Sequence, residues 1–232
     1  MHRLWRRHDP PLTPSGLVFL PESNNAPLII FGGTFDPVHL GHLRIIEAVC
    51  DRLKAAQVVW LPAGQPPHRP TPGASAPQRL AMLELALAHE PRFIIDTREL
   101  HRLGPSYTVL SLAELKAEHP ERTLCLVLGL DAALALPQWH RWQDVLELAN
   151  IAVMRRPGWS LPDPLPSWWV SAQRSGGDNP PAYPSTWIKA IEVPAVDISA
   201  AQIRADLAAG RPIDQKVPVA IARYIEEHEL YE

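Results

Sequence analysis

The chain has 232 residues, 46% of them apolar, so it is long enough for one sizeable core and short for two independent domains. Its 22 basic and 25 acidic side chains leave a formal net charge of -3, which excludes binding of nucleic acid by charge alone. No segment is long and apolar enough to cross a membrane. Cys50 and Cys125 lie in apolar segments and are expected to be buried thiols, which favours a reducing, cytoplasmic compartment.

The N-terminal segment, residues 1–26, is rich in proline and mixed in polarity, and it lacks the continuous apolar run of a signal peptide. We expect it to form a flexible extension. The folded domain is expected to comprise residues 27–232, and the sequence contains no evident internal repeat.

Beyond the extension, short apolar runs alternate with longer segments of helical period, which is typical of parallel strands joined by crossover helices. Each run is short and apolar enough to be buried in a sheet. The predicted strands are Leu28–Phe31, Val58–Leu61, Phe93–Asp96, Thr123–Leu128, Ile151–Met154 and Ile188–Val193. The predicted fold class is therefore a single α/β domain with a doubly wound parallel sheet.

Apolar faces predict helices between these strands. Their members are Leu43, Ile46, Ala48, Val49 and Leu53; Leu80, Leu83 and Leu87; and Val109, Leu112 and Leu115. A later helix is expected to begin near Ser199 and to end before Gly210, and an amphipathic helix is expected over Val217–His228. Two proline-rich segments, 62–77 and 155–185, are expected to be long loops, the second being either a partly ordered insertion or a lid.

The first predicted strand leads directly into the string Gly32-Gly33-Thr34-Phe35-Asp36-Pro37-Val38-His39-Leu40-Gly41-His42, and a predicted helix follows. Such a junction is where open α/β sheets bind ligands, and its glycine amides and first helical turn suit a phosphate. If the helix starts near Val38, His39 and His42 share one face and both imidazoles can donate to one phosphate. Gly41 would then leave space for a nucleotide. Taken alone, the two histidines would more simply be surface polar residues.

The whole string narrows these alternatives. It lacks the Gly-Lys-Ser/Thr of a P-loop and the glycine spacing of a dinucleotide fingerprint. It resembles the G-x-F-D-P-x-H-x-G-H signature of the nucleotidylyltransferase superfamily, and from Phe31 almost to Tyr231 the chain is similar to the bacterial nicotinate-nucleotide adenylyltransferase family. Further matching segments are Pro66–Pro70, Pro105–Thr108, Leu128–Asp131, Trp139, Arg155–Gly158 and Ile198–Arg204. The resemblance implies a Rossmann-like nucleotidylyltransferase fold.

The resemblance also implies a reaction. The adenylyl group of ATP would be transferred to nicotinate mononucleotide, giving deamido-NAD and pyrophosphate in NAD biosynthesis, by direct in-line attack without a covalent enzyme intermediate. Magnesium would arrive with ATP, because no carboxylate cluster predicts a protein metal site. The expected partners are ATP and nicotinate mononucleotide, with no nucleic acid and no membrane, and the sequence leaves the oligomeric state open.

Site roles follow from the matching positions. Catalytic roles are expected for His39, His42 and Arg204. The expected ATP-binding residues are Gly32, Gly33, Thr34, Phe35, His39, His42, Gly129, Asp131, Ser199 and Arg204. The expected nicotinate mononucleotide-binding residues are His68, Arg69, Tyr107, Thr108, Trp139, His140 and Arg156. In the family, the amides of Thr108 and His140 would receive the carboxylate, while Trp139 is suited to stack on the pyridine ring. Helix capping is the simpler explanation of Asp131 and Ser199.

The sequence departs from the family pattern at Ala201, where a Thr is usual, and at Leu130, where Gln or Ala is more usual. Loss of the Thr hydroxyl would remove one hydrogen bond to the triphosphate and raise the ATP requirement. His140 replaces a frequent Tyr, which matters less if its backbone makes the contact.

Three alternative functions share some of these features. The nearest is an adenylyl- or cytidylyltransferase for another phosphorylated acceptor, against which Thr108, Trp139 and Pro66–Pro70 argue. A catalytically silent nucleotide-binding module is disfavoured by the intact His39 and His42. An aminoacyl-tRNA synthetase is disfavoured by the short chain and the missing Lys-rich signature loop.

Overall fold

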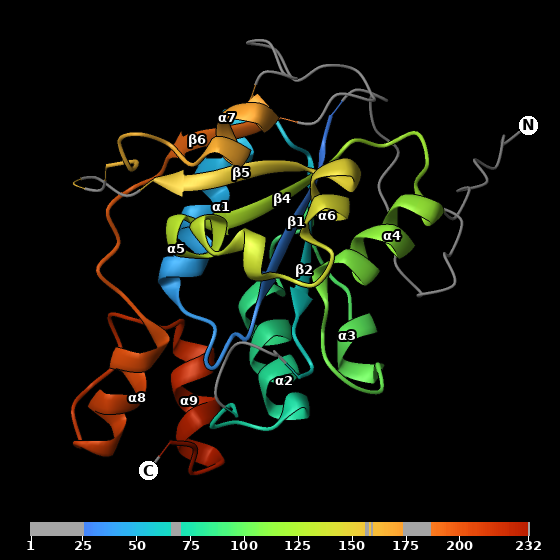
Figure 1. The fold of residues 1–232 in the computed structure, drawn as a ribbon. Helices are drawn as coiled ribbons and strands as arrows, with labels where there is room; N and C mark the ends of the chain where they lie inside the picture. The colour runs from blue at the N-terminus through green and yellow to red at the C-terminus, as the bar shows by residue number, and fades with distance from the viewer. Residues whose placement is uncertain (1–25, 66–70, 156–157, 159, 174–186, 232) are drawn as a thin grey trace, which may run out of the picture.

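Six parallel strands form the sheet on which the molecule is built, in the order β3-β2-β1-β4-β5-β6 (Figure 1). The computed structural model describes residues 26–65, 71–155, 158, 160–173 and 187–231. The strands are β1 (Leu28–Gly33), β2 (Gln57–Pro62), β3 (Phe93–Ile95), β4 (Leu124–Gly129), β5 (Asn150–Arg155) and β6 (Ile188–Glu192). The predicted α/β fold with a doubly wound parallel sheet is confirmed, and each predicted strand end lies within two residues of the observed one.

Helices connect the strands and cover both faces of the sheet. They are α1 (Leu40–Leu53), α2 (Ala76–Leu87), α3 (Arg98–His101), α4 (Thr108–Glu118), α5 (Leu130–Leu134), the 3-10 turn η1 (Leu136–Gln138), α6 (Trp142–Leu148), α7 (Ser167–Gln173), α8 (Ala200–Ala208) and α9 (Val219–Glu227). Among the described residues, no helix combines the length and apolar character needed to cross a membrane.

The central strand β1 is buried on both faces, which is why it reads as a continuous apolar run. Ile29 and Phe31 face one core, which is completed by side chains of α1, α2, α8 and α9. Leu28 and Ile30 face the other core, which is completed by α4, α5, α6 and α7. The alternation of side chains along an extended strand thus assigns each set of helices to its own face.

The predicted apolar faces pack on the two cores, although Leu43, Ala48 and Leu53 of α1 are only half-buried, and α2 shows one exchange. In α2, Leu83 and Leu87 are buried while Leu80 is only half-buried. Its neighbour Arg79 is 1% exposed instead, so a guanidinium occupies a core position of this helix. The helix is initiated by a reciprocal cap, in which Ser75 Oγ accepts from the Gln78 amide at 3.4 Å and Gln78 Oε1 accepts from the Ser75 amide at 2.9 Å.

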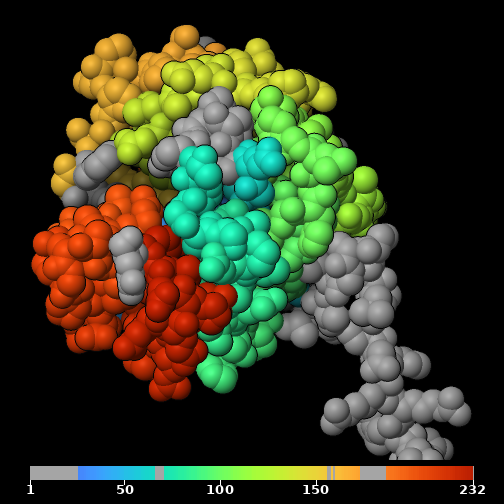
Figure 2. Space-filling view, turned by 90° about the horizontal axis from the view of Figure 1, so that it is seen from below, coloured from blue at the N-terminus to red at the C-terminus, as the bar shows by residue number. Residues whose placement is uncertain are grey.

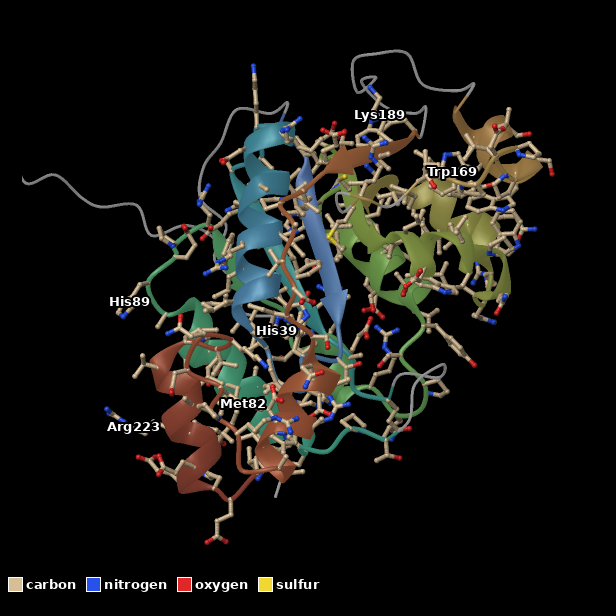
Figure 3. The ribbon with its side chains drawn as sticks, turned by 90° about the vertical axis from the view of Figure 1, so that its left-hand side faces the viewer. His39, Met82, His89, Trp169, Lys189 and Arg223 are labelled. Atoms are coloured by element: carbon tan, nitrogen blue, oxygen red, sulfur yellow. The ribbon has the colours of Figure 1, made fainter. Side chains whose placement is uncertain are left out.

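Within the segment 155–185, which was expected to be a long loop, Ser167–Gln173 form the helix α7. Trp169 of α7 is fully buried in the second core, and Figure 3 labels it at the upper right, beside α7. Trp168 lies edge-on to Trp142 of α6, with the ring centroids 5.7 Å apart. Residues 174–186 lie outside the described residues, as do residues 1–25 of the expected extension.

Both cysteines are buried and unpaired thiols, as expected. Burial raises the pKa of Cys50 to about 11 and that of Cys125 to about 12, because a thiolate loses its hydration in the core. Both belong to the first core, where they serve as small apolar side chains.

Candidate active site at the ends of beta1 and beta4

The carboxyl ends of β1 and β4 form the switch point of the sheet. These neighbouring strands lead in opposite directions, since β1 continues to β2 on one side and β4 continues to β5 on the other. Ligands of open α/β sheets bind in the crevice outside such a point. His39 lies near the end of β1 in Figure 3, and α8 and α9 lie beyond that end of the sheet in Figures 1 and 3.

His39 and His42 cap the start of α1 reciprocally. The amide of His42 donates to His39 Nδ1 at 3.3 Å, and the amide of His39 donates to His42 Nδ1 at 3.2 Å. The two rings stack with centroids 3.6 Å apart. The expected helix start near Val38 is therefore wrong by two residues: α1 begins at Leu40, and His39 is its N-cap. The expectation that the two imidazoles lie together is correct.

The cap also sets the tautomer of both rings. A ring nitrogen that accepts an amide hydrogen carries no proton, so each neutral imidazole has its proton on Nε2. The result is a pair of Nε2–H donors held at the positive end of α1. Such an arrangement is suited to an anion with several oxygens, such as a phosphoryl group.

Two of the three glycines of the motif, Gly33 and Gly41, are required by neighbouring rings. A Cβ at Gly33 would lie 2.9 Å from the ring of Phe35, and one at Gly41 would lie 2.9 Å from His39 Nδ1. Gly41 was expected to leave space for a nucleotide; in the structure it leaves space for the folded ring of His39. Phe35, which has a positive φ of 51°, places its ring edge-on to His42 at 5.3 Å.

Asp36 organises the connection after β1, although the sequence analysis gave it no role. Its carboxylate is 6% exposed and accepts hydrogen bonds from the amides of Gly73 at 2.8 Å and Ala74 at 2.9 Å, and from the hydroxyl of Tyr231 at 2.8 Å. Arg204 Nη1 donates to the carbonyl of Asp36 at 2.6 Å and lies 3.6 Å from its carboxylate. The structure thus brings Arg204 to the histidine motif, as the resemblance implied.

The C-terminal segment contributes a backbone hydrogen bond to the motif and contains a capped helix of its own. The carbonyl of Lys216 accepts from the Leu40 amide at 2.9 Å, which satisfies another donor in the first turn of α1. Ser199 caps α8, since its Oγ accepts from the Gln202 amide at 3.2 Å. Asp206 of α8 binds Lys216, Arg211 and Gln202, and these bonds lower the pKa of its carboxyl. Ser199 is thus an N-cap, as expected.

The remaining expected ATP-binding residues occupy the two strand ends. Gly32 and Gly33 end β1, and the carbonyl of Thr34 accepts from Arg79 Nη1 at 2.6 Å. Gly129 ends β4 and precedes α5, in whose first turn Asp131 is exposed. No hydrogen bond of Asp131 caps α5, so capping does not account for this carboxylate.

A second group of expected residues lies where α4 begins. Thr108 is the first residue of α4, so its amide is at a helix start, as expected. The ring of Tyr107 stacks on that of His140 with centroids 4.3 Å apart, which joins the α4 start to the segment after η1. Trp139, the neighbour of His140, is half-buried against the second core. The structure therefore brings Tyr107 and His140 together.

The sequence analysis also did not predict a buried hydrogen-bond network next to this group. Ser106 Oγ accepts from the amides of Gly64 at 3.0 Å and Gln65 at 3.2 Å. Glu99 of α3 is 4% exposed, accepts from Ser111 Oγ at 2.7 Å and is also bonded to Ser106. Burial raises the pKa of the Glu99 carboxyl, while the two serine hydroxyls oppose that rise.

Three expected acceptor-binding residues, His68, Arg69 and Arg156, lie outside the described residues. Arg155, the neighbour of Arg156, pairs with Glu192 across β5 and the edge strand β6. In the described part of the chain, no group of three or more His, Cys, Asp or Glu side chains is arranged to hold a metal ion.

Comparisons with known proteins agree with this geometry. Residues 30–206 match the family model described as cytidylyltransferase-like. The chain is 40% identical over 213 residues to a "Probable nicotinate-nucleotide adenylyltransferase" of Acidithiobacillus ferrooxidans, covering 90% of this chain and 98% of that one. A protein of the same name from Laribacter hongkongensis is 46% identical over 206 residues, with 87% and 93% covered.

Solved structures show the same fold. A Plasmodium falciparum nicotinic acid mononucleotide adenylyltransferase complexed with NaAD superposes with a TM-score of 0.67 at 16% identity, covering 89% of this chain and 98% of that one. The same enzyme complexed with APC gives a TM-score of 0.65 with the same coverage. With the identity to the curated relatives and the family model over most of its length, the chain belongs to the nicotinate-nucleotide adenylyltransferase family of cytidylyltransferase-like nucleotidyltransferases.

Proposed function

We propose that this protein transfers the adenylyl group of ATP to nicotinate mononucleotide, forming deamido-NAD and releasing pyrophosphate in NAD biosynthesis. The observation that carries the proposal is the reciprocal cap of His39 and His42, which presents two Nε2–H donors at the positive end of α1 beside the switch point. The names of the curated relatives support the choice of acceptor.

The proposed chemistry is a single displacement at phosphorus. An oxygen of the acceptor's phosphate attacks the α-phosphorus of ATP in line, the bond between the α-phosphorus and the α,β-bridging oxygen breaks, and pyrophosphate leaves with the electron pair. No covalent enzyme intermediate forms, so the protein contributes positioning and stabilisation of charge. His39 and His42 donate to the transferring phosphoryl group, while Arg204 and the first turn of α8 behind Ser199 hold the departing pyrophosphate.

Magnesium is proposed to reach the site on the triphosphate, where it would neutralise phosphate charge. The residues at the site fit this mode of delivery. Asp36 already accepts three hydrogen bonds and faces Arg204, and the described residues offer no group of three metal-binding side chains. Substrate oxygens and water would therefore be its ligands.

The acceptor is proposed to bind between the start of α4 and the segment after η1. The amides of Thr108 and His140 would receive the nicotinate carboxylate, and Trp139 would stack on the pyridine ring. The stacked rings of Tyr107 and His140 support this arrangement, because they fix the two segments against each other. Roles for His68, Arg69 and Arg156 at the acceptor's phosphate rest on the family resemblance alone.

The test is pyrophosphate release from ATP and magnesium with nicotinate mononucleotide, nicotinamide mononucleotide or phosphopantetheine as the acceptor. We expect release with nicotinate mononucleotide well above the other two, because amide donors prefer the carboxylate to a neutral amide. Preference for phosphopantetheine would move the chain to a sister activity, and silence with all three would favour a nucleotide-binding module without catalysis.

The compartment is proposed to be the cytoplasm. Two buried free thiols, Cys50 and Cys125, support a reducing environment, in which cysteines serve as small core residues. Fractionation of the native host, followed by detection of the protein, would test this assignment.

A further inference from the structure

The carboxylate of Asp36 joins four segments that are far apart in the sequence. It accepts from the amides of Gly73 and Ala74 and from the hydroxyl of Tyr231, a residue 195 positions away, and Arg204 of α8 lies 3.6 Å from it. A buried carboxylate with this many donors is fixed in orientation, because each bond restricts the same two oxygens. The position of Asp36 therefore depends on groups outside its own loop.

The ring of Tyr231 is tightly packed beside its hydrogen bond to Asp36. Its backbone has a φ of 67°, which is uncommon for a residue with a large side chain. A Cβ at Gly73 would lie 3.0 Å from the ring of Tyr231 and 3.6 Å from Arg204 Cδ, so the ring, the glycine and the stem of Arg204 form one packed layer. Burial and the bond to Asp36 raise the pKa of the Tyr231 hydroxyl, so it remains a neutral donor.

Arg204 depends on Asp36 through two contacts. Its guanidinium donates to the Asp36 carbonyl at 2.6 Å and faces the carboxylate of the same residue. Its side chain is 36% exposed, so these contacts, and not burial alone, determine where the guanidinium lies. A shift of Asp36 would move the backbone carbonyl and the carboxylate together, and Arg204 with them.

We propose that Tyr231 is a positioning residue for ATP, which holds Arg204 in place through the buried carboxylate of Asp36. The inference rests on the proposed function, in which Arg204 binds the phosphates of ATP. Tyr231 touches neither substrate in this role. It acts at the phosphate side, because its hydroxyl bonds to Asp36 and its ring lies beside Gly73, whereas the acceptor half is built around the stacked rings of Tyr107 and His140.

The test compares Tyr231→Phe with the matched variant Tyr224→Phe. Phenylalanine keeps the packed ring at position 231 and removes only the hydroxyl, and Tyr224 of α9 is half-buried and stacks on His228 away from Asp36. The dissociation constant for ATP with magnesium is measured by calorimetry without an acceptor, and KM is then measured for each substrate. We expect Tyr231→Phe to weaken ATP binding roughly threefold to twentyfold, since only part of a charged hydrogen bond is transmitted to Arg204.

The same variant should leave the KM for nicotinate mononucleotide unchanged, and Tyr224→Phe should match the wild type in both constants. Unchanged ATP affinity, or an equal loss for both substrates with a lower melting temperature, would overturn the proposal in favour of a purely structural tyrosine. Because ATP affinity is measured without an acceptor, an error in the proposed acceptor leaves this result interpretable.

A double-mutant cycle with Arg204→Gln tests whether Tyr231 affects ATP binding through Arg204. If Tyr231 acts through Arg204, Tyr231→Phe should cause little further loss of ATP affinity in the Arg204→Gln background. Equal losses in both backgrounds would show that Tyr231 acts on ATP by another path and would reject the proposed one.

Discussion

The two halves of the site are each supported by one buried carboxylate, but the carboxylates have different partners. Asp36, on the phosphate half, accepts from two backbone amides and a distant tyrosine and lies 3.6 Å from a guanidinium. Glu99, on the acceptor half, is bonded to the hydroxyls of Ser106 and Ser111 and lies in a site whose burial raises its pKa. One half is thus organised by charge, the other by neutral hydroxyl groups.

The difference is also one of chain distance. The bonds of Asp36 reach residues 37 to 195 positions away, in the loop before α2 and in the C-terminal segment. Glu99 accepts from Ser111, which is 12 positions away. Its other partner, Ser106, accepts a hydrogen bond from the amide of Gly64. In the space-filling view of Figure 2, the α8–α9 region and the α2 region lie side by side, which is how the distant partners of Asp36 come together. Substitutions in one half should therefore leave the other half's substrate constants unchanged.

The largest expected effect comes from the phosphate half. His42→Gln keeps a side chain that can complete the cap at this helix position but removes the imidazole donor. We expect kcat to fall roughly a hundredfold to a thousandfold with little change in melting temperature. His42→Ala should lose, in addition, about 0.5–2 kcal/mol of stability from the missing cap. Near-normal turnover of His42→Gln would remove His42 from the chemistry.

In the acceptor half, the main expected effect of a substitution is on the stability of the fold. Glu99→Ala removes the acceptor of two buried hydroxyls, and we expect the free energy of unfolding to fall by about 2–4 kcal/mol. Denaturation by urea measures it, with the exposed Glu47→Ala as the control. A loss below that of the control would show that the Glu99 network contributes nothing.

The raised pKa of Glu99 gives this prediction a pH dependence. Between the ordinary pKa of a glutamate, about 4.3, and the raised value in the fold, the folded state retains a proton that the unfolded state has released. The wild type therefore loses stability relative to Glu99→Gln as pH rises through that window. Parallel pH profiles of the two proteins would contradict a raised pKa.

A smaller effect is expected where the pyridine ring would stack. Trp139→Ala should raise the KM for nicotinate mononucleotide roughly tenfold to thirtyfold, through lost stacking and apolar contact. The dissociation constant for ATP should stay the same, because Trp139 packs on the second core, away from Asp36 and Arg204. Trp168→Ala, which removes a tryptophan of the same core, is the control. Equal effects of both variants would mean that Trp139 only packs.

The smallest expected effect is a gain on the phosphate half. Ala201 is exposed in the first turn of α8, so Ala201→Thr adds a hydroxyl where the family pattern has one. We expect the KM for ATP to fall roughly twofold to tenfold, the value of one net hydrogen bond. Steady-state kinetics at saturating acceptor measure it, and an unchanged or higher KM would show that this hydroxyl does not reach the triphosphate.

The sequence predicted well what depends on local pattern. Apolar runs such as Leu28–Phe31 located all six strands, since strands buried on both faces leave a continuous signal. The string from Gly32 to His42 predicts the phosphate end of the proposed site, and Ser199 was correctly predicted to cap a helix. The reciprocal histidine cap was not predicted, because it requires the side chains to fold back onto each other's amides.

The missed residues are those whose roles depend on distant contacts. Nothing in the sequence near Tyr231 indicates that it bonds to Asp36. In α2, the apolar pattern predicts that Leu80 is buried, whereas the buried residue is its neighbour Arg79. Glu99 belongs to a helix of only four residues. Asp36 is the exception, since its place inside the recognised motif could have directed attention to it.

The bond between Asp36 and Tyr231 has a consequence for synthesis on the ribosome. Translation proceeds at about 5–20 residues per second, so a span of 195 positions takes roughly 10 to 40 s to complete. The hydroxyl that completes the hydrogen bonds of Asp36 is synthesised that long after the carboxylate itself. Until Tyr231 has bonded to Asp36, we expect ATP affinity to stay lower by the factor expected for Tyr231→Phe.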